Sequence, residues 1–502
     1  MHYNSYFWEL YKRTNQGIEF IDLFENFNHK KISKVLETNT YYSDLNEDEI
    51  KRYKKVMFVT SNEVDLTKHW VHLFKSELFE NPKEKFIDLL NKDLYLELVD
   101  YKLEKQKYQT WLSEIHLIST ALFQVEKDFF IPYFYSGNFL TLEKIFEFFK
   151  IPLPKIPKKK DWNDRVLFYL EICETLFEFR KLNNLSRSEL CAFLYDFAPN
   201  TVKETLSEEY PKPTKTWFCG ASKYDFKFLD NANQNTIDSW QGNADTRKGD
   251  IIVMYCLSPR SYIHSIWLAE RDGFIDPFFH YYSMVYISKP VFLKHISQKE
   301  LELNEIFSKN ALIRKNLQGI NGYPISFEEY EELLIMLEEK GQSINELPRI
   351  EPNILLDNNE LNTERDVEIN LVEPLLKRLE FETNDWVRQM PVKMGRGERN
   401  YPDYCFGANQ KRGEETAKMI LETKYSIRNS KELQNAYYQA KSYAMRLQAI
   451  KFILASNEGI WIFEQVKGVY NFNENITYTW FQLEHPDNYH SALKLIGRKT
   501  II

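Results

Sequence analysis

Cysteine is scarce in this chain of 502 residues, and its placement excludes two common kinds of scaffold. The five cysteines are scattered and include no CxxC pair, so we expect neither a disulfide framework nor a zinc cluster. No apolar run approaches the ~20 residues of a membrane span, and the first residues lack the apolar core of a signal peptide. We therefore expect a soluble, cytoplasmic protein with no membrane partner.

Several catalytic signatures are also missing. The chain has no GxxxxGK[ST] loop, so no NTP is expected as a cofactor and any motor would have to be a separate protein. It contains neither a GxSxG elbow nor an HExxH helix. His69 and His72 are close in sequence but have no third ligand nearby, so we interpret them as solvated or core histidines.

The residues that are abundant indicate a large globular protein with an uneven charge. Hydrophobic residues make up 43% of the chain, enough for two to four domains. The formal net charge is -8, yet the segment 386–451 carries 13 Lys/Arg against 6 Asp/Glu. Because nucleic acid responds to the local field, the acidic total does not exclude DNA binding.

Apolar spacing predicts a helical region over residues 1–210. The segments 85–103 and 166–182 repeat apolar residues every three or four positions, as amphipathic helices do. A Pro/Lys stretch at 151–162 is expected to separate two helical bundles. Near residue 187 we expect a helix capped by Ser186 or Ser188, although this stretch also resembles the start of a helix-turn-helix. The role of this region stays unassigned.

Residues 211–343 have a different pattern. Short runs rich in β-branched and aromatic residues predict strands near 215–222, 249–257, 262–270 and 281–293, followed by a helix at 326–341. We expect a small mixed sheet or barrel here. Residues 344–362 are polar and contain proline, so we interpret them as a linker.

The last part, residues 363–502, predicts an α/β domain. An amphipathic helix begins after Thr363, which is placed to cap it. Strands are predicted at 387–394, 402–406 and 418–427, then a helix at 431–448 and two more strands around the turn at 457–459. The expected fold class for the whole chain is multidomain α+β.

Two carboxylates and a lysine in this domain suggest a metal site. Side chains alternate along a strand, so Glu422 and Lys424 project on one face, and Asp403 reaches that face if its strand pairs alongside. Carboxylate oxygens suit Mg²⁺, which neutralises a phosphate and activates a water, while the lysine stabilises developing negative charge. The same residues are also compatible with a solvated charged hairpin.

The surrounding pattern resembles the PD-(D/E)xK nuclease superfamily, most closely the nuclease domain of type I restriction enzyme R subunits. It covers about residues 360–480 and matches Pro402-Asp403, Glu422-x-Lys424, Glu364 and the pair Gln439 and Tyr443. The resemblance implies that Asp403 and Glu422 bind metal and Lys424 is catalytic. It also implies that Glu364 supports the metal, with Glu368 as a substitute, and that Gln439 and Tyr443 serve the nuclease site or DNA. Two mild departures are Glu380 in place of a glycine and SNEG in place of TNG.

The middle region resembles the EVE branch of PUA-like domains. The match spans about residues 214–336 and rests on Trp217, Trp240, Gly249-Asp250 and Tyr255. It implies a pocket in which Trp217, Trp240 and Tyr255 stack on a flipped base while Asn243 reads its edge. For each aromatic residue, membership of the core of a small barrel is the alternative.

Together these features predict a Mg²⁺-dependent DNA endonuclease of a restriction or phage-defence system. Its partner is double-stranded DNA carrying modified bases, read by the middle domain and cut by the C-terminal one. A single-site nuclease must pair, or bind twice, to break both strands, which makes a homodimer a further expectation. The alternatives are a nuclease activated by another ligand or RNA, and a catalytically silent nucleic-acid-binding protein.

Overall fold

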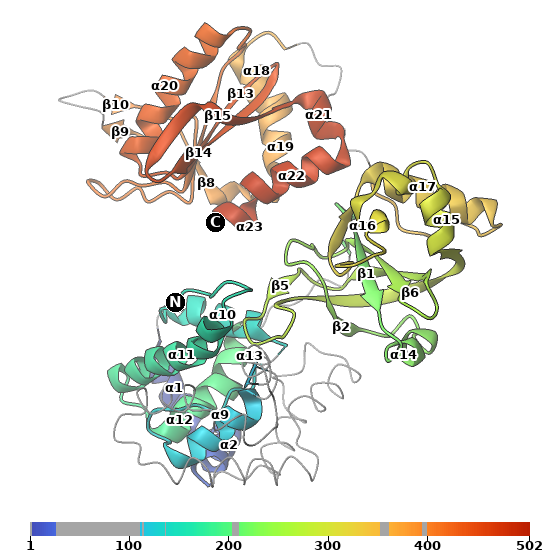
Figure 1. Ribbon diagram of the computed structural model, residues 1–502. Helices are drawn as coiled ribbons and strands as arrows, with labels where there is room; N and C mark the ends of the chain where they lie inside the picture. The colour runs from blue at the N-terminus through green and yellow to red at the C-terminus, as the bar shows by residue number, and fades with distance from the viewer. Residues whose placement is uncertain are drawn as a thin grey trace. The chain divides into compact units, whose positions relative to one another are not determined.

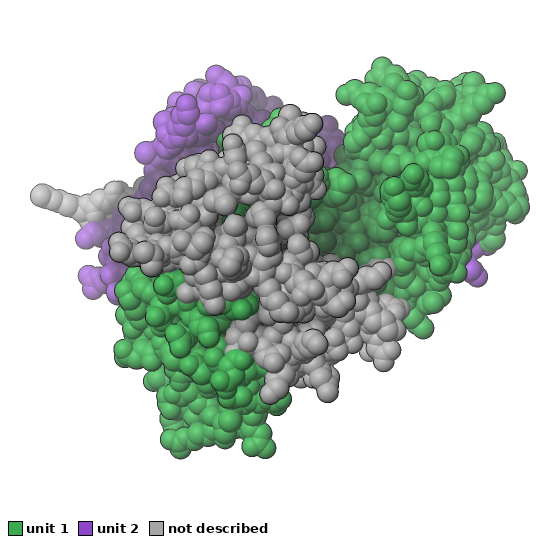
Figure 2. Space-filling model, turned by 60° about the horizontal axis from the view of Figure 1, so that its bottom comes forward, with its two compact units in different colours: residues 1–211, 217–324, 336–344 green, residues 212–216, 325–335, 345–502 purple. Residues whose placement is uncertain are grey.

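The computed structural model describes residues 3–26, 111–112, 115–135, 137–202, 210–351, 361–393 and 399–502. His69, His72 and the helix predicted at 85–103 lie outside these ranges. The fold is mixed α/β, and the chain forms two compact units (Figures 1 and 2). Unit 1 contains Met1–Pro211, Trp217–Pro324 and Met336–Ile344, and unit 2 contains the remainder. No helix within the described ranges is long and apolar enough to cross a membrane.

The described residues up to 202 contain helices and no strand. The helices are α1 (Ser5–Lys12), α2 (Asn15–Glu25), α9 (Ile115–Val125), α10 (Phe139–Phe149), α11 (Trp162–Leu182), α12 (Arg187–Ala192), the π-helix η2 (Phe193–Phe197) and α13 (Ala198–Val202). Ser186 caps α12 and forms a capping box with Glu189, so of the two predicted caps the first is confirmed. The Pro/Lys stretch lies between α10 and α11 and is not helical.

The middle region is built on a seven-stranded sheet in the order β2-β6-β4-β3-β1-β7, with β5 paired to β6. The strands are β1 (Thr216–Ala221), β2 (Asp238–Gln241), β3 (Ile251–Cys256), β4 (Tyr262–Ala269), β5 (Phe274–Ile275), β6 (Ser283–Ser297) and β7 (Tyr323–Ile325). The helical elements are α14 (Phe226–Asp230), α15 (Gln298–Leu303), η3 (Phe307–Lys309), α16 (Ala311–Arg314) and α17 (Phe327–Glu339).

One hydrophobic core joins the helical region to the middle sheet within unit 1. Phe274, Phe278, Met284 and Tyr286 belong to the same buried cluster as the helices. Arg165 of α11 is fully buried and donates to the backbone carbonyls of Pro277, at 2.8 Å, and Phe279, at 2.5 Å. Because a buried guanidinium needs its donors satisfied, these bonds fix the loop after β5 onto α11.

The C-terminal region has a six-stranded sheet in the order β15-β14-β13-β12-β11-β8. The strands are β8 (Trp386–Arg388), β11 (Tyr404–Phe406), β12 (Met419–Thr423), β13 (Lys451–Ser456), β14 (Gly459–Val466) and β15 (Val469–Thr479); β9 (Val392–Lys393) and β10 (Arg399–Asn400) form a separate ribbon. The helical elements are α18 (Glu364–Val367), η4 (Glu368–Val372), α19 (Glu373–Arg378), η5 (Thr383–Asp385), α20 (Ser430–Arg446), α21 (Trp480–Glu484), α22 (Pro486–Ile496) and α23 (Arg498–Ile501).

Helices cover both faces of this sheet, as Figure 1 shows. The helices from α18 to α19, together with α21, α22 and α23, pack on one face through a cluster that includes Leu421. Helix α20 packs on the other face, against Ile420. It also connects β12 to β13, which pair in parallel, so it forms the crossover of a βαβ unit. Both faces are therefore buried, which explains the long apolar strands in the sequence.

Besides Asn345–Ile502, unit 2 contains two earlier stretches, Lys212–Thr216 and Ile325–Ile335. The segment expected to be a linker begins in packed structure, because Leu347 and Ile350 are buried. The Tyr330 hydroxyl donates to the carbonyl of Pro348 at 2.7 Å.

Candidate functional site

The strand register brings Asp403 and Glu422 together. Strands β11 and β12 are antiparallel, and Tyr404 pairs with Leu421. Asp403 precedes Tyr404 and Glu422 follows Leu421, so the two carboxylates lie opposite each other where β12 ends. Directly opposed residues of an antiparallel pair project on the same face of a sheet. Asp403 Oδ2 accepts a hydrogen bond from the backbone N–H of Thr423 at 2.7 Å, which fixes its orientation.

Lys424 and Gln439 complete a connected group around Glu422. Gln439 Nε2 donates to Glu422 Oε1 at 2.8 Å, and Lys424 Nζ lies 3.4 Å from the same oxygen. The lysine ammonium also donates to the Thr423 carbonyl at 2.9 Å. Lys424 is half-buried, so its charge is held at the carboxylate and also faces solvent. All these contacts lie on the face covered by α20.

Helix α20 supplies two side chains to this group. The Asn429 side chain caps the helix by accepting from the backbone N–H groups of Lys431 and Glu432. Gln439 and Tyr443 are four residues apart, so they lie one above the other on the helix face that meets the sheet. Gln439 Nε2 is 3.2 Å from the Tyr443 hydroxyl. Five of the six residues expected at the nuclease site are thus neighbours: Asp403, Glu422, Lys424, Gln439 and Tyr443.

The pKa values of both carboxylates are raised by burial and by neighbouring negative charge. Burial raises the pKa of Asp403 to about 6, and the charges of Glu364 and Glu368 add to that rise. Burial and the neighbouring Asp403 raise the pKa of Glu422 to about 7. Lys424 opposes both shifts without cancelling them. A site of this kind favours an added cation, because a cation would stabilise both charged forms.

Glu422 also presents an oxygen with no bonding partner. Its side chain is 3% exposed, and its Oε2 atom is buried without a hydrogen bond. Leaving a buried carboxylate oxygen unsatisfied costs about 1–3 kcal/mol or more. The residues present therefore fit a divalent ion such as Mg²⁺: Asp403 and Glu422 would hold it, and Glu422 Oε2 is an available ligand atom.

Glu364 and Glu368 differ in whether their carboxylates already have bonding partners. Glu368 is buried and paired with Arg365 and Arg388. Glu364 is the first residue of α18 and half-buried, and in the part of the chain that the structure describes its carboxylate makes no hydrogen bond or ion pair. Of the two, Glu364 is the carboxylate that can still serve a metal ion near Asp403.

Arg388 is a residue that the sequence did not identify. It lies in β8, pairs with Glu368 and donates to Glu373 Oε1 at 3.1 Å. Its guanidinium also lies over the Tyr404 ring, 5.0 Å from the ring centroid. It thereby neutralises Glu368 beside the candidate site. No local motif marks it, because its partners lie 15 to 20 residues earlier in the chain.

The aromatic residues expected to bind a base in the middle region lie in different environments. Trp217 is buried, and its indole N–H donates to Asp250 at 2.9 Å. Tyr255 is also buried, between Met254 and Cys256, whose side chains belong to the core on the opposite face of β3. Among the described residues, no ring contact joins Trp217, Trp240 and Tyr255.

Trp240 and Asn243 remain more accessible. Both are half-buried at the end of β2. The Trp240 indole N–H donates to the Gly220 carbonyl at 3.1 Å, and the Asn243 amide donates to the Gly322 carbonyl at 3.0 Å. Gly322 has a φ of +72°, and a Cβ there would lie 2.6 Å from the backbone nitrogen of Asn243, so only glycine permits this approach.

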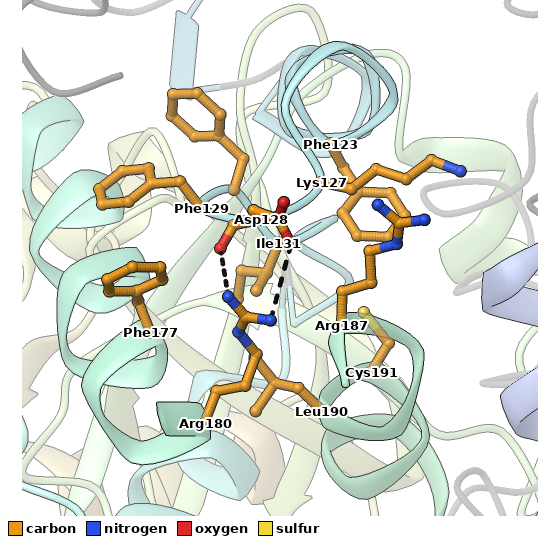
Figure 3. Close-up of a pocket in the computed structure, with 11 residues that line it drawn as sticks. Phe123, Lys127, Asp128, Phe129, Ile131, Phe177, Arg180, Arg187, Leu190 and Cys191 are labelled. Carbon is orange, nitrogen blue, oxygen red and sulfur yellow. Dashed lines mark hydrogen bonds and ion pairs between the residues drawn. The ribbon is translucent and has the colours of Figure 1, made fainter. Parts of the chain in front are cut away.

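A cavity in the helical region is too small to be a substrate site (Figure 3). It measures about 10 Å³, room for a single water molecule. Phenylalanines line it together with Lys127, Arg180 and Arg187, and Arg180 donates to the Asp128 carbonyl at 3.0 Å. The side-chain ion pair between Arg180 and Asp128 further reduces the local charge.

A second group of potential metal ligands, Glu328, His485 and Asp487, is fully used within unit 2. His485 Nε2 lies 2.9 Å from a Glu328 oxygen. One oxygen of Asp487 pairs with Lys215 and the other accepts from the backbone N–H of Phe327 at 2.9 Å. We assign this cluster to the packing of α17 on α22.

Comparisons with known proteins add little. No family model and no curated protein matches the chain. A solved structure of a hypothetical protein from Leishmania major is 18% identical over 26% of this chain and 97% of its own, with a TM-score of 0.22. The NMR structure of Rpa0253 from Rhodopseudomonas palustris is 15% identical over 26% of this chain and 99% of its own, with a TM-score of 0.23. Neither likeness assigns a family or a function to this chain.

Proposed function

We propose that this protein is a Mg²⁺-dependent DNA endonuclease whose phosphodiester-cleaving site is the cluster of Asp403, Glu422 and Lys424. The observation that carries the proposal is the buried, unpartnered Oε2 of Glu422, opposite a second carboxylate and beside a lysine. The three-layered arrangement, with the cluster at the end of β12, is compatible with the restriction-endonuclease-like core that the sequence motifs imply.

Each side chain has a task in this reaction. The Thr423 N–H orients Asp403, and the Gln439 amide orients Glu422. The Lys424 ammonium can donate to the attacking water or to the phosphate, since two of its contacts are to protein oxygens and it still reaches solvent. Asp403 and Glu422 would hold Mg²⁺, which would neutralise charge on the phosphate and lower the pKa of the attacking water.

The middle region is proposed to select the DNA. Trp240 and Asn243 are the candidate side chains for this role because both are half-buried; the Trp240 ring stacks on Phe228, and the Asn243 amide bonds the Gly322 carbonyl and the Asp245 N–H. Trp217 and Tyr255, which are buried, would support that surface from the interior. The proposed biological setting is restriction of DNA carrying modified bases, as in phage defence.

The test uses purified full-length protein, Mg²⁺ and otherwise identical duplexes that are unmodified, methylated or hydroxymethylated. Cutting of modified DNA alone supports the complete proposal. Equal cutting of all duplexes supports a nuclease whose middle region senses another ligand or RNA. An absence of cleavage on every substrate favours a catalytically silent binding protein.

Replacing the lysine tests the assignment of the site. Lys424→Ala should abolish cleavage and leave DNA binding intact, because the carboxylates and the surrounding surface remain. Lys377→Ala is a matched control, since Lys377 is exposed at the end of α19 and should not affect cleavage. If the Lys424→Ala protein still cuts at the rate of the control, the site assignment is wrong.

A further inference from the structure

The turn between β13 and β14 carries a carboxylate, Glu458, that binds the segment following Lys424. The Ser426 hydroxyl donates to Glu458 Oε1 at 2.8 Å, and the backbone N–H of Ile427 donates to Oε2, also at 2.8 Å. The Ser456 hydroxyl donates to Oε2 at 2.6 Å from the end of β13. The carboxylate thus ties two separate stretches of chain together.

The backbone around Lys424 belongs to the same arrangement. Its N–H donates to the Ala455 carbonyl at 2.8 Å, and the N–H of Asn457 donates to the Tyr425 carbonyl at 3.2 Å. These bonds extend the pairing of β12 and β13 past the end of β12. Residues 424–429 form neither helix nor strand, so beyond Tyr425 the bonds to Glu458 replace the ladder as the constraint on the backbone.

This segment connects two parts of the candidate site. It begins at Lys424, whose ammonium contacts Glu422, and it ends at Asn429, which caps α20. Helix α20 in turn carries Gln439, which also contacts Glu422. A shift of the segment would therefore move the lysine and the amide relative to the carboxylate that they both bind.

We infer that Glu458 is a positioning residue for the nuclease reaction, acting through Ser426 and Ile427 on Lys424 and Gln439. The inference deepens the proposed function and rests on it. Glu458 has no contact with Asp403 or Glu422 among the described hydrogen bonds, so its effect is on geometry rather than on metal binding. Glu458 is the third residue of SNEG in this turn, where the PD-(D/E)xK nucleases that the sequence resembles have TNG.

The contacts of Glu458 also predict which substitutions are tolerated. Glutamine can keep all three partners: its oxygen can accept from Ile427 and Ser456, and its amide can donate to the Ser426 hydroxyl. Alanine loses all three bonds. The charge of Glu458 also pairs with Arg428, whose Nε lies 4.0 Å from Oε1, but this pair is solvent-exposed and contributes little. Hydrogen bonding, more than the negative charge, is therefore the property that should matter.

The experiment measures steady-state cleavage by wild type, Glu458→Ala and Glu458→Gln, with Glu474→Ala as control. Glu474 is exposed on β15, and its carboxylate has no partner within the described structure. Because a misplaced group slows chemistry more than binding, Glu458→Ala should lower kcat by about tenfold or more, with KM changed by less than about twofold. Glu458→Gln should retain at least about half of the wild-type kcat. Equal kcat for Glu458→Ala and wild type, or a change confined to KM, overturns the inference.

A second measurement does not depend on cleavage. Amide hydrogen exchange in peptides covering residues 424–429 should be faster in Glu458→Ala than in wild type and unchanged in Glu458→Gln. If wild type cuts no DNA, the nuclease proposal fails while exchange still reports on the segment. If wild type cuts but exchange in Glu458→Ala equals that of wild type, the positioning role fails and the nuclease proposal stands.

Discussion

Replacing Glu422 by glutamine should stabilise the metal-free protein while removing its response to Mg²⁺. The two side chains have the same shape, and the retained oxygen can still accept from Gln439. In wild type the buried carboxylate has its pKa raised from 4.5 to about 7, because burial and Asp403 disfavour its charged form. Glutamine carries no charge and therefore does not incur this penalty.

The size of the effect follows from the pKa shift. One pKa unit corresponds to 1.36 kcal/mol, so the charged Glu422 destabilises the folded metal-free protein by about 3 kcal/mol above pH 7. The sign follows from proton binding: the folded state holds the proton more tightly, so wild type loses stability as the pH rises from 4.5 to about 7. The advantage of the Glu422→Gln variant should therefore be large at pH 8 and small at pH 4.5.

Thermal unfolding at pH 8, in EDTA and in excess Mg²⁺, measures both parts of this prediction. In EDTA the variant should melt roughly 6–12 °C above wild type, since each kcal/mol shifts the midpoint by about 2–4 °C in a domain of this size. Mg²⁺ should raise the midpoint of wild type only. The control Glu474→Gln, at an exposed carboxylate, should match wild type in both conditions. A variant less stable than wild type in EDTA, or equally stabilised by Mg²⁺, would refute the reasoning.

Three further predictions concern neighbouring residues. Glu364→Gln should raise the Mg²⁺ concentration for half-maximal cleavage about tenfold. Glu368→Gln loses its buried ion pairs and should chiefly lower the midpoint of urea unfolding. The opposite result for the two variants would mean that Glu368, and not Glu364, serves the metal. Gln439→Leu should lower kcat about tenfold, since a hydrogen bond to a charged group is worth about 1.5–3 kcal/mol; an unchanged kcat would remove the amide from the site. Arg165→Met should destabilise unit 1 by about 3 kcal/mol, because three carbonyls lose their donor at about 1 kcal/mol or more each; an unchanged midpoint of urea unfolding would show that these bonds are dispensable.

Elements with strong local signals were predictable. The strand Lys451–Ser456 contains the apolar run 452–455 with one polar residue at each end, and Thr363 caps the predicted amphipathic helix. The predicted helix at 431–448 corresponds to α20, Ser430–Arg446. In each case the signal is local, because side-chain caps and apolar periodicity act over a few residues.

Elements that depend on distant partners were not predicted. The strands β2, β5 and β7 contain two to four residues, so their pairing partners and not their composition define them. The π-helical turn η4 interrupts the predicted helix between Val367 and Glu373, just before Pro374, which has no N–H to donate to Asn370 four residues earlier; this local signal was missed. The edge strand β15 has a largely exposed and polar pattern, which resembles a loop until its pairing with β14 is known.

At the candidate site, the sequence by itself determined that Glu422 and Lys424 share a face of a strand, because side-chain alternation is a property of the extended backbone. It also determined that Gln439 and Tyr443 share a face of a helix. Tertiary structure decided that Asp403 lies opposite Glu422, because ladder register depends on pairing between separate strands. It likewise decided that Glu364 is free while Glu368 is paired, because the partner Arg388 comes from a strand 20 residues away.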